Sequence, residues 1–352
     1  MKRLGVSLVG LVLPIVIALA LGCVLVFLIG ESPGEMMKYL WWGAFGTMGN
    51  TLITLRWATP LILSGLAVTV AYRAGLFNMG GDGQIYIGAL CAAIVGVELA
   101  LPAYIHLPVA LMAAALGGAL FALIPAILKV HLKVNEIVTT LMFNYIGLLL
   151  TDYLVLLFYF QGDSNKAVEI AMPRIRDTAA IARIVPRYPL TWGIMVSIAL
   201  AIVVQIILKR TVWGYEKETL GANPRFAQYI GINIKRSALM AFMISGAIAG
   251  IAGGLEILGT NRRFVSHFST GLGNEGIVVA LLGRTDPLGM VVAGLFLAAL
   301  KNGFFAVERM TNIDRSVAIV LQGMILLFIS SRALVRVFYG LGKGEDSDGR
   351  NS

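Results

Sequence analysis

Long apolar stretches alternate with short polar connections along nearly the whole chain. A helix needs about 20 residues, at about 1.5 Å rise each, to cross the hydrocarbon core of a bilayer. The stretches that predict such helices are 5–29, 50–73, 84–101, 108–129, 137–160, 190–208, 237–259, 272–283, 288–305 and 316–333. The eighth is too short to span comfortably and predicts a half-helix or re-entrant element, which only protein or a wet cavity can accommodate at that depth. We therefore predict an all-α integral membrane protein with about ten transmembrane segments, one of them broken or re-entrant.

Composition supports one membrane domain without a separate soluble one. The chain of 352 residues is 58% hydrophobic and 13% charged, whereas soluble domains carry about 25% charged residues. We expect a single transmembrane domain over 1–352, with a short cytoplasmic tail at about 334–352. The net charge of +9 does not require nucleic acid as a partner, because basic inner loops that face anionic lipid account for it.

The distribution of Lys and Arg predicts the orientation. With the N-terminus inside, ten crossings place both termini in the cytoplasm, and the inner loops and the tail are then basic. These basic residues are Lys129, Lys133, Lys209, Arg210, Lys217, Arg225, Lys235, Arg236, Arg332, Arg336 and Lys343. The loop 161–189 would lie outside although it also carries Lys and Arg, partly offset by acidic residues.

Two polar stretches interrupt the apolar pattern. The first, "GLFNMGGDGQIYIGAL" from Gly75, contains Asn78, Asp82 and Gln84, and the second, "GLGNEGIVVALLGRTDPLG", contains Asn274. Both contain Gly-Leu-x-Asn followed shortly by Gly, and in the predicted topology one follows an inward crossing and the other an outward crossing. An inverted repeat would produce this arrangement, and transporters place substrate paths at such paired broken helices. The alternative is two ordinary loops at the membrane surface.

Asn144 completes the set of residues that we predict along a substrate path. It lies within the segment 137–160 and shares a helix face with Thr140, four residues earlier. The predicted path residues are Asn78, Asp82, Gln84, Asn144 and Asn274.

The longest inner loop, 209–236, contains signals for a short helix. Asn223 is a suitable N-cap, Pro224 suits the first helical position, and Gly231 suits a left-handed end. This helix is either a surface turn between two spans or a docking element for a cytoplasmic subunit.

Three glycines in the next span are spaced four residues apart. Gly246, Gly250 and Gly254 therefore share one helix face and allow another helix to approach closely. This face is expected to pack within the bundle or at a subunit contact, and it does not indicate catalysis.

Several catalytic motifs are absent from the sequence. It lacks a phosphate-binding G-x-x-x-x-G-K-[ST] loop, so we expect no ATP hydrolysis by this chain, and it lacks H-E-x-x-H and C-x-x-C. The G-x-S-x-G spacing occurs once, at Gly30–Gly34, but it follows an apolar stretch that predicts a membrane helix and not the strand that a nucleophile elbow requires. The three histidines lie in different loops, far apart in sequence. We therefore predict no catalytic residues, no bound metal and no cofactor held by this chain.

Four blocks that together cover most of residues 50–300 resemble a known family. "TPLILSGLAVTVAYRAGLFNMGGDGQIYIGAL", "VNEIVTTLMFNYI", "LGANPRFAQYIGINIKRSALMAFMISGAIAGIAGG" and "GNEGIVVALLGRTDPLGMVVAGLFLAAL" resemble the permease subunits of ABC-type nucleoside importers. That group is a branch of the ribose and simple-sugar permease family. Sugar permeases usually show Asp-Leu-Ser-Val-Gly where this chain has the GLFN stretch, which favours the nucleoside branch.

The resemblance implies partners and a division of labour. A second, related but distinct permease chain would complete the pathway, two ATP-binding subunits that use ATP and Mg would dock beneath, and an extracytoplasmic binding protein or lipoprotein would deliver ligand. The membrane would be a bacterial-type inner or plasma membrane. The docking element would be a coupling helix that involves Gly221, Asn223, Pro224, Arg225, Gln228 and Gly231. Asp82 stands where the family commonly has Glu, so the resemblance gives it no fixed role.

Three other functions remain open at this point. A simple-sugar permease of the same architecture is the nearest alternative. A secondary transporter driven by an ion gradient would instead move solute without any ATPase. A membrane-embedded enzyme is disfavoured by the missing motifs.

Overall fold

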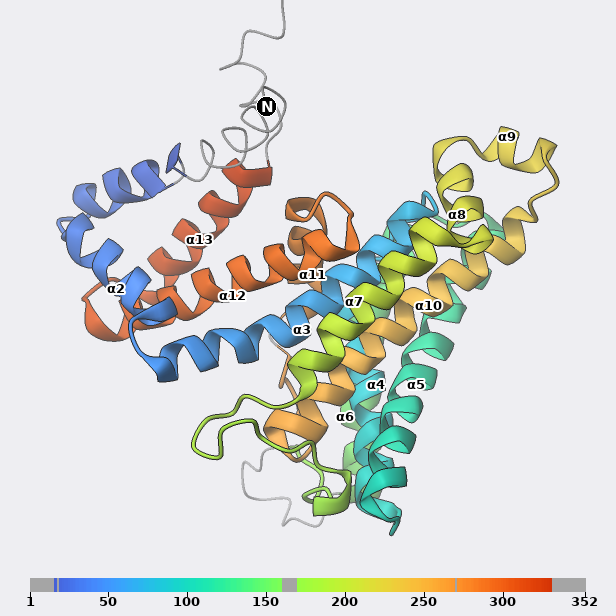
Figure 1. Ribbon diagram of the computed structural model, residues 1–352, viewed down its shortest axis with the longest axis horizontal. Helices are drawn as coiled ribbons and strands as arrows, with labels where there is room; N and C mark the ends of the chain where they lie inside the picture. The colour runs from blue at the N-terminus through green and yellow to red at the C-terminus, as the bar shows by residue number, and fades with distance from the viewer. Residues whose placement is uncertain (1–15, 18, 160–169, 270, 331–352) are drawn as a thin grey trace, which may run out of the picture. The chain divides into compact units, whose positions relative to one another are not determined.

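The computed structural model describes residues 16–17, 19–159, 170–269 and 271–330 (Figure 1). Within these ranges the chain is helical, with loops and two isolated antiparallel bridges. The start of the first predicted segment, part of the loop 161–189 and the predicted tail at 334–352 lie outside the described residues. The helices are α2 (Pro33–Phe45), α3 (Met48–Arg73), α4 (Gly81–Glu98), α5 (Ala103–Leu132), α6 (Glu136–Tyr159), α7 (Gly193–Arg210), α8 (Val212–Ala222), α9 (Pro224–Tyr229), α10 (Ile234–Leu255) with a π-helical continuation (Glu256–Asn261), α11 (Leu272–Leu282), α12 (Pro287–Met310) and α13 (Arg315–Ser330), besides the short 3-10 turn Asp177–Ala179.

Each predicted segment overlaps a helix, but the predicted count of about ten spans is not confirmed. Among the described residues, six helices are long and apolar enough to cross a membrane: α3, α5, α6, α7, α10 with its continuation, and α12. The helix Leu19–Leu28 and α11 are too short by this measure, and α4 begins with the polar run Gly81-Asp82-Gly83-Gln84. The eighth segment is a helix of only 11 residues, as the length of its apolar run predicted, and its re-entrant placement stays a prediction.

The chain divides into two compact units, Met1–Thr51 with Ala299–Ser352, and Leu52–Ala298. In the first unit, α2 was not predicted, because its apolar residues alternate with Glu35 and Lys38 over only 13 residues. Ser32 caps this helix by accepting from the Glu35 amide, and Pro33 occupies its first turn. The Asn302 amide on α12 donates to the carbonyl oxygens of Gly43 (2.8 Å) and Asn50 (3.0 Å), and it thereby ties α2 and the start of α3 to α12.

The core of the second unit is a close packing of α4, α5 and α10 around glycine and alanine. The face formed by Gly246, Gly250 and Gly254 lies against α5 (Figure 1). A Cβ atom added to Gly250 would lie 2.2 Å from the Ala114 carbonyl oxygen, and one added to Gly246 would lie 2.4 Å from that of Gly118. Since side chains are absent at these positions, the backbones of α5 and α10 approach each other directly.

The second unit has two distinct ends. At one end, α8 and α9 lie beside the C-terminal ends of α3 and α5 and the start of α10, where Ala74, Leu76, Ala126, Leu220, Ala227, Ala238, Ala241 and Phe242 form one buried cluster. At the other end, the segment that begins at Ile170 pairs with the loop that follows α10, through the Ala171–Val265 bridge and the Met172 amide on the Phe264 oxygen (2.9 Å). Figure 1 shows α9 at one end of the unit and residues 170–192, which lead into α7, at the other.

Candidate functional site

The first polar stretch breaks the helical path between α3 and α4. Helix α3 ends at Arg73, Gly75 takes a left-handed conformation (φ +73°), and α4 begins only at Gly81. The buried Asn78 side chain shapes this break: its oxygen accepts from the Gly80 amide (3.1 Å) and from Gln84 Nε2 (3.0 Å). Its nitrogen donates to Gln84 Oε1 (2.9 Å) and to the Ser245 hydroxyl (2.8 Å). The side-chain amides of Asn78 and Gln84 therefore hydrogen-bond to each other, and the bond from Asn78 to Ser245 links the break to α10.

Helix α6 holds the other side of the break. The Asn144 side chain accepts from the Gly83 amide (2.9 Å) and donates to the Met79 oxygen (2.8 Å), and Thr140 accepts from the Met79 amide (3.2 Å). These side chains, predicted to share a face, satisfy backbone groups that a helix start leaves without intrahelical partners.

The start of α11 meets the start of α4. Asp82 Oδ1 accepts from the Gly273 amide (2.8 Å), and a Cβ atom added to Gly273 would lie 2.2 Å from the Asp82 nitrogen. One turn further along α4, the Tyr86 hydroxyl donates to the Ser269 oxygen (2.9 Å). Helix N-termini carry partial positive charge, so the carboxylate of Asp82 lies where two such termini converge. We call residues 78–86 together with 269 and 271–274 the α4–α11 junction.

Four of the five predicted path residues therefore lie together. Asn78, Asp82 and Gln84 are buried and Asn144 is half-buried, and each of the four forms a hydrogen bond with a backbone group or with another of the four. Asn274 is exposed in the first turn of α11. Contact of these residues with a solute stays a prediction.

An apolar cavity of about 220 Å³ opens beside the break. It is lined by Val68, Tyr72, Leu76, Phe77, Asn78, Met79, Ile277, Ala280, Leu281 and Thr285. The rings of Tyr72 and Phe77 meet edge to face, with centroids 5.3 Å apart. The cavity therefore joins the end of α3, the break and α11 around one space.

The predicted short helix is confirmed as α9. The Asn223 side chain accepts from the Phe226 amide (3.1 Å), Pro224 opens the helix, and Gly231 is left-handed (φ +87°). Ala227 is buried, whereas Phe226 and Tyr229 are exposed, Tyr229 by 89%. The remaining residues that the resemblance placed here, Gly221, Arg225 and Gln228, are also exposed.

Contacts connect α8 and α9 to both broken elements. A Cβ atom added to Gly75 would lie 3.0 Å from Gly221 Cα, and Arg73 pairs with Glu218 (3.1 Å) while its Nε donates to the Thr285 oxygen (3.0 Å). The same end of α11 is held by a Lys209–Asp286 ion pair (2.8 Å). Burial raises the pKa of Asp286, but hydrogen bonds from Lys209 and the Gly289 amide outweigh it, and the pKa lies below its ordinary value.

Several buried charged contacts were not predicted from the sequence. Lys217, counted among the basic residues of the predicted inner loops, is buried on α8, where its ammonium donates to Ser237 and lies 4.9 Å from the centre of the Trp213 ring. Burial lowers the pKa of Lys217. At the other end, Arg56 on α3 pairs with Glu256 (2.6 Å) at the start of the π-helical turn. No sequence motif identified these pairs.

In the described ranges, no group of three or more His, Cys, Asp or Glu side chains is arranged to hold a metal ion. The six apolar helices among the described residues indicate a multi-pass membrane protein, and its family is one of transport permeases. The chain belongs to the family of branched-chain amino acid transport system permease components, whose model matches residues 50–330.

Curated relatives match over most of the chain. It is 37% identical to the guanosine ABC transporter permease protein NupP of Bacillus subtilis over 342 residues, 96% of this chain and 97% of the relative. It is 33% identical to the glucose ABC transporter permease protein TsgB13 of Haloferax volcanii, over 90% of this chain and 86% of the relative. It is 29% identical to the nucleoside ABC transporter permease protein NupB of Lactococcus lactis, over 92% of this chain and 90% of the relative. No solved structure matches the chain significantly.

In two of these organisms, a second permease also matches the chain. NupQ of Bacillus subtilis, named as a guanosine permease, is 28% identical over 69% of this chain and 77% of the relative. NupC of Lactococcus lactis, named as a nucleoside permease, is 26% identical over 70% of this chain and 78% of the relative.

Proposed function

We propose that the chain is the membrane-spanning permease subunit of an ATP-driven ABC importer for nucleosides. The observation that carries the substrate class is similarity along almost the whole chain to a guanosine permease. The GLFN stretch, which forms the break before α4, favours the same branch. ATP and Mg belong to two separate ATP-binding subunits, and nothing covalent happens to the solute.

A simple-sugar importer is the second candidate. The observation that favours it is the similarity to a glucose permease, which also extends over most of the chain.

The remaining subunits follow from the relatives and the exposed surfaces. A related but distinct permease chain is the proposed partner in the membrane, supported by the matches to two nucleoside-type permeases in each of two organisms. An extracytoplasmic binding protein or lipoprotein supplies the solute. Both termini and α9 lie in the cytoplasm.

The α4–α11 junction supports the proposed inverted repeat. Two segments of the chain have a similar order of elements. In one, the long helix α3 is followed by the break and the start of α4, and in the other, the long helix α10 is followed by a loop and the start of α11. The two starts meet at Gly81 and Gly273. Paired broken helices of this kind place a solute path at the interface between repeats.

The transport step is alternating access driven through α9. Closure of the ATP-binding subunits moves α9, which is packed through Ala227 on the ends of α3, α5 and α10. The motion reaches the break through Gly221 and Gly75, and it reaches the end of α11 through Arg73 and Thr285. The path offers a weak polar lining of amides without strong binding, because a solute that binds tightly leaves slowly.

Replacement of Tyr229 by Asp tests the docking role of α9. Copurification of the ATP-binding subunits is expected to fall by about tenfold or more, since an exposed aromatic anchor at an interface centre is typically worth about 2 kcal/mol. Tyr104→Asp is the matched control, because Tyr104 is 78% exposed at the start of α5, at the other end of the unit. Equal copurification with both variants would remove α9 from the docking surface.

Competition uptake tests the substrate class. Cells that depend on this importer for labelled guanosine should lose uptake in excess unlabelled guanosine, adenosine or uridine, and should keep it in excess ribose, galactose or glucose. If the importer carries labelled glucose and no labelled guanosine, and only the sugars compete for that uptake, the sugar proposal replaces the nucleoside one.

A further inference from the structure

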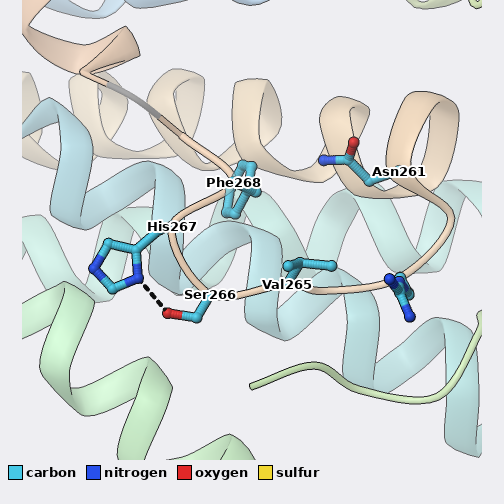
Figure 2. Close-up of a pocket in the computed structure, with 6 residues that line it drawn as sticks. Asn261, Val265, Ser266, His267 and Phe268 are labelled. Carbon is cyan, nitrogen blue, oxygen red and sulfur yellow. Dashed lines mark hydrogen bonds between the residues drawn. The ribbon is translucent and has the colours of Figure 1, made fainter. Parts of the chain in front are cut away.

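A cavity of about 390 Å³ lies at the end of the second unit opposite α9. It is lined by Asn261, Arg263, Val265, Ser266, His267 and Phe268, all in the connection between α10 and α11 (Figure 2). This volume lies within the range of about 300–1,000 Å³ that small-molecule sites occupy. The sequence analysis assigned none of these residues to a substrate site.

The loop that forms the cavity is fixed in place. Phe264 is fully buried, its oxygen accepts from the Met172 amide (2.9 Å), and the Ser266 amide donates to the Ile170 oxygen (2.8 Å). The left-handed residues Arg262 and His267 (φ +58° each) turn the chain on either side of this paired stretch. A loop held this way loses little conformational freedom when a ligand binds.

One wall of the cavity is aromatic. The half-buried Phe268 ring lies 4.9 Å from the Tyr86 ring and 5.7 Å from the Phe264 ring, centroid to centroid. Both partners are buried, so they hold Phe268 from behind while it lines the cavity. Flat nucleobases stack on such rings, and stacking is worth about 1–3 kcal/mol per base in single-strand binding proteins.

The other walls supply neutral and cationic hydrogen-bonding groups. The Asn261 amide, the Arg263 guanidinium and the Ser266 hydroxyl line the cavity, and Ser266 hydrogen-bonds to His267 Nδ1 (2.7 Å; Figure 2). Among the described residues that line it, none carries a carboxylate. Donors and acceptors around one aromatic wall match the polar edges and hydroxyls of a nucleoside better than they match a simple sugar, which has no flat ring to stack.

The aromatic wall is coupled to the α4–α11 junction. Tyr86, which supports Phe268, also donates to the Ser269 oxygen and lies one helix turn from Asp82, which accepts from the Gly273 amide. A ligand that contacts Phe268 therefore touches the segment that leads into the start of α11.

We propose that this cavity is an outer receiving subsite that stacks the base of an incoming nucleoside on Phe268 before the solute reaches the α4–α11 junction. The inference rests on the proposed function and adds the site and the feature of the substrate that it recognises. The base is recognised by its flat face, and Asn261, Arg263 and Ser266 bind its edge and the ribose.

Saturation-transfer NMR on the purified complex in lipid nanodiscs, without the binding protein, tests this subsite with guanosine as the probe. The wild type and Phe268→Tyr should both transfer saturation to the H8 proton of the base. In Phe268→Leu, which keeps an apolar side chain, the saturation-transfer signal of H8 should be at least about fivefold weaker. Ser266→Trp, which fills the cavity from outside the aromatic cluster, should also abolish the signal. Guanosine monophosphate and ribose serve as parallel probes, and ribose should give the same weak signal with every variant.

Uptake measurements separate this inference from the proposed function. Phe268→Leu should raise the KM for guanosine by about tenfold at an unchanged amount of assembled complex. If the wild type imports guanosine and both Phe268→Leu and Ser266→Trp keep wild-type binding and KM, the subsite is wrong and the proposed function stands. If ribose saturates as strongly as guanosine, base stacking is wrong. If the wild type imports no nucleoside, both proposals fail.

Discussion

Replacement of Gly250 by Leu is expected to reduce the amount of folded protein in the membrane by at least about tenfold. A Cβ atom at this position would lie 2.2 Å from the Ala114 oxygen, and the facing Gly88 would place its own Cβ 2.3 Å from Gly250 Cα. Both obstacles are backbone, so α4 and α5 would have to move away from α10. Overpacking of this kind costs about 1–3 kcal/mol and sometimes more. Size-exclusion of the detergent-solubilised chain, with a fluorescent tag, measures the folded amount.

Gly323 on α13 provides the matched control. A Cβ atom added there would meet no atom of the described residues within 4 Å, so Gly323→Leu should leave the folded amount close to that of the wild type. If Gly250→Leu were as well folded as Gly323→Leu, the close packing of α10 on α4 and α5 would be refuted.

Replacement of Asp82 by Ala is expected to lower solute uptake by about tenfold or more while the complex still assembles. The substitution removes the acceptor of the buried Gly273 amide and the negative charge between two helix starts. A buried donor left without its partner costs about 1–3 kcal/mol. The change destabilises the junction in the form described here, and it shifts the balance between the conformations through which the solute must pass.

Asp82→Asn is the informative companion. It keeps an oxygen that can accept from Gly273 but loses the charge, so uptake should fall less than in Asp82→Ala. Uptake by Asp82→Ala at the wild-type rate, measured with equal amounts of complex in vesicles, would show that the junction has no part in transport.

Local features were predictable because their causes are local. Asn223, Pro224 and Gly231 defined α9 correctly, since capping and the left-handed preference of glycine act within a few residues. The short helix α11 followed from the length of its apolar run. The spacing of Gly246, Gly250 and Gly254 also identified a close-packed face, although it did not identify α5 as the helix that packs there.

Long-range pairings were not predictable. Asp82 and Gly273 are 191 residues apart, and Asn78 meets Ser245 across 167 residues, so only the fold brings them together. The sequence identified the polar residues of the break but not that they hydrogen-bond to one another and to the backbone. The burial of Lys217 was not predictable for the same reason, because it comes from the tertiary contacts with Trp213 and Ser237.

The central claim is that this chain is a passive gated path that takes its energy from separate ATP-binding subunits. Reconstitution in liposomes tests it most directly, with purified chain alone, chain with its partner permease, and the full complex with ATP-binding subunits and binding protein. The account predicts guanosine accumulation only in the full complex, and only with ATP and Mg. Accumulation by the chain alone, driven by an ion gradient, would contradict it.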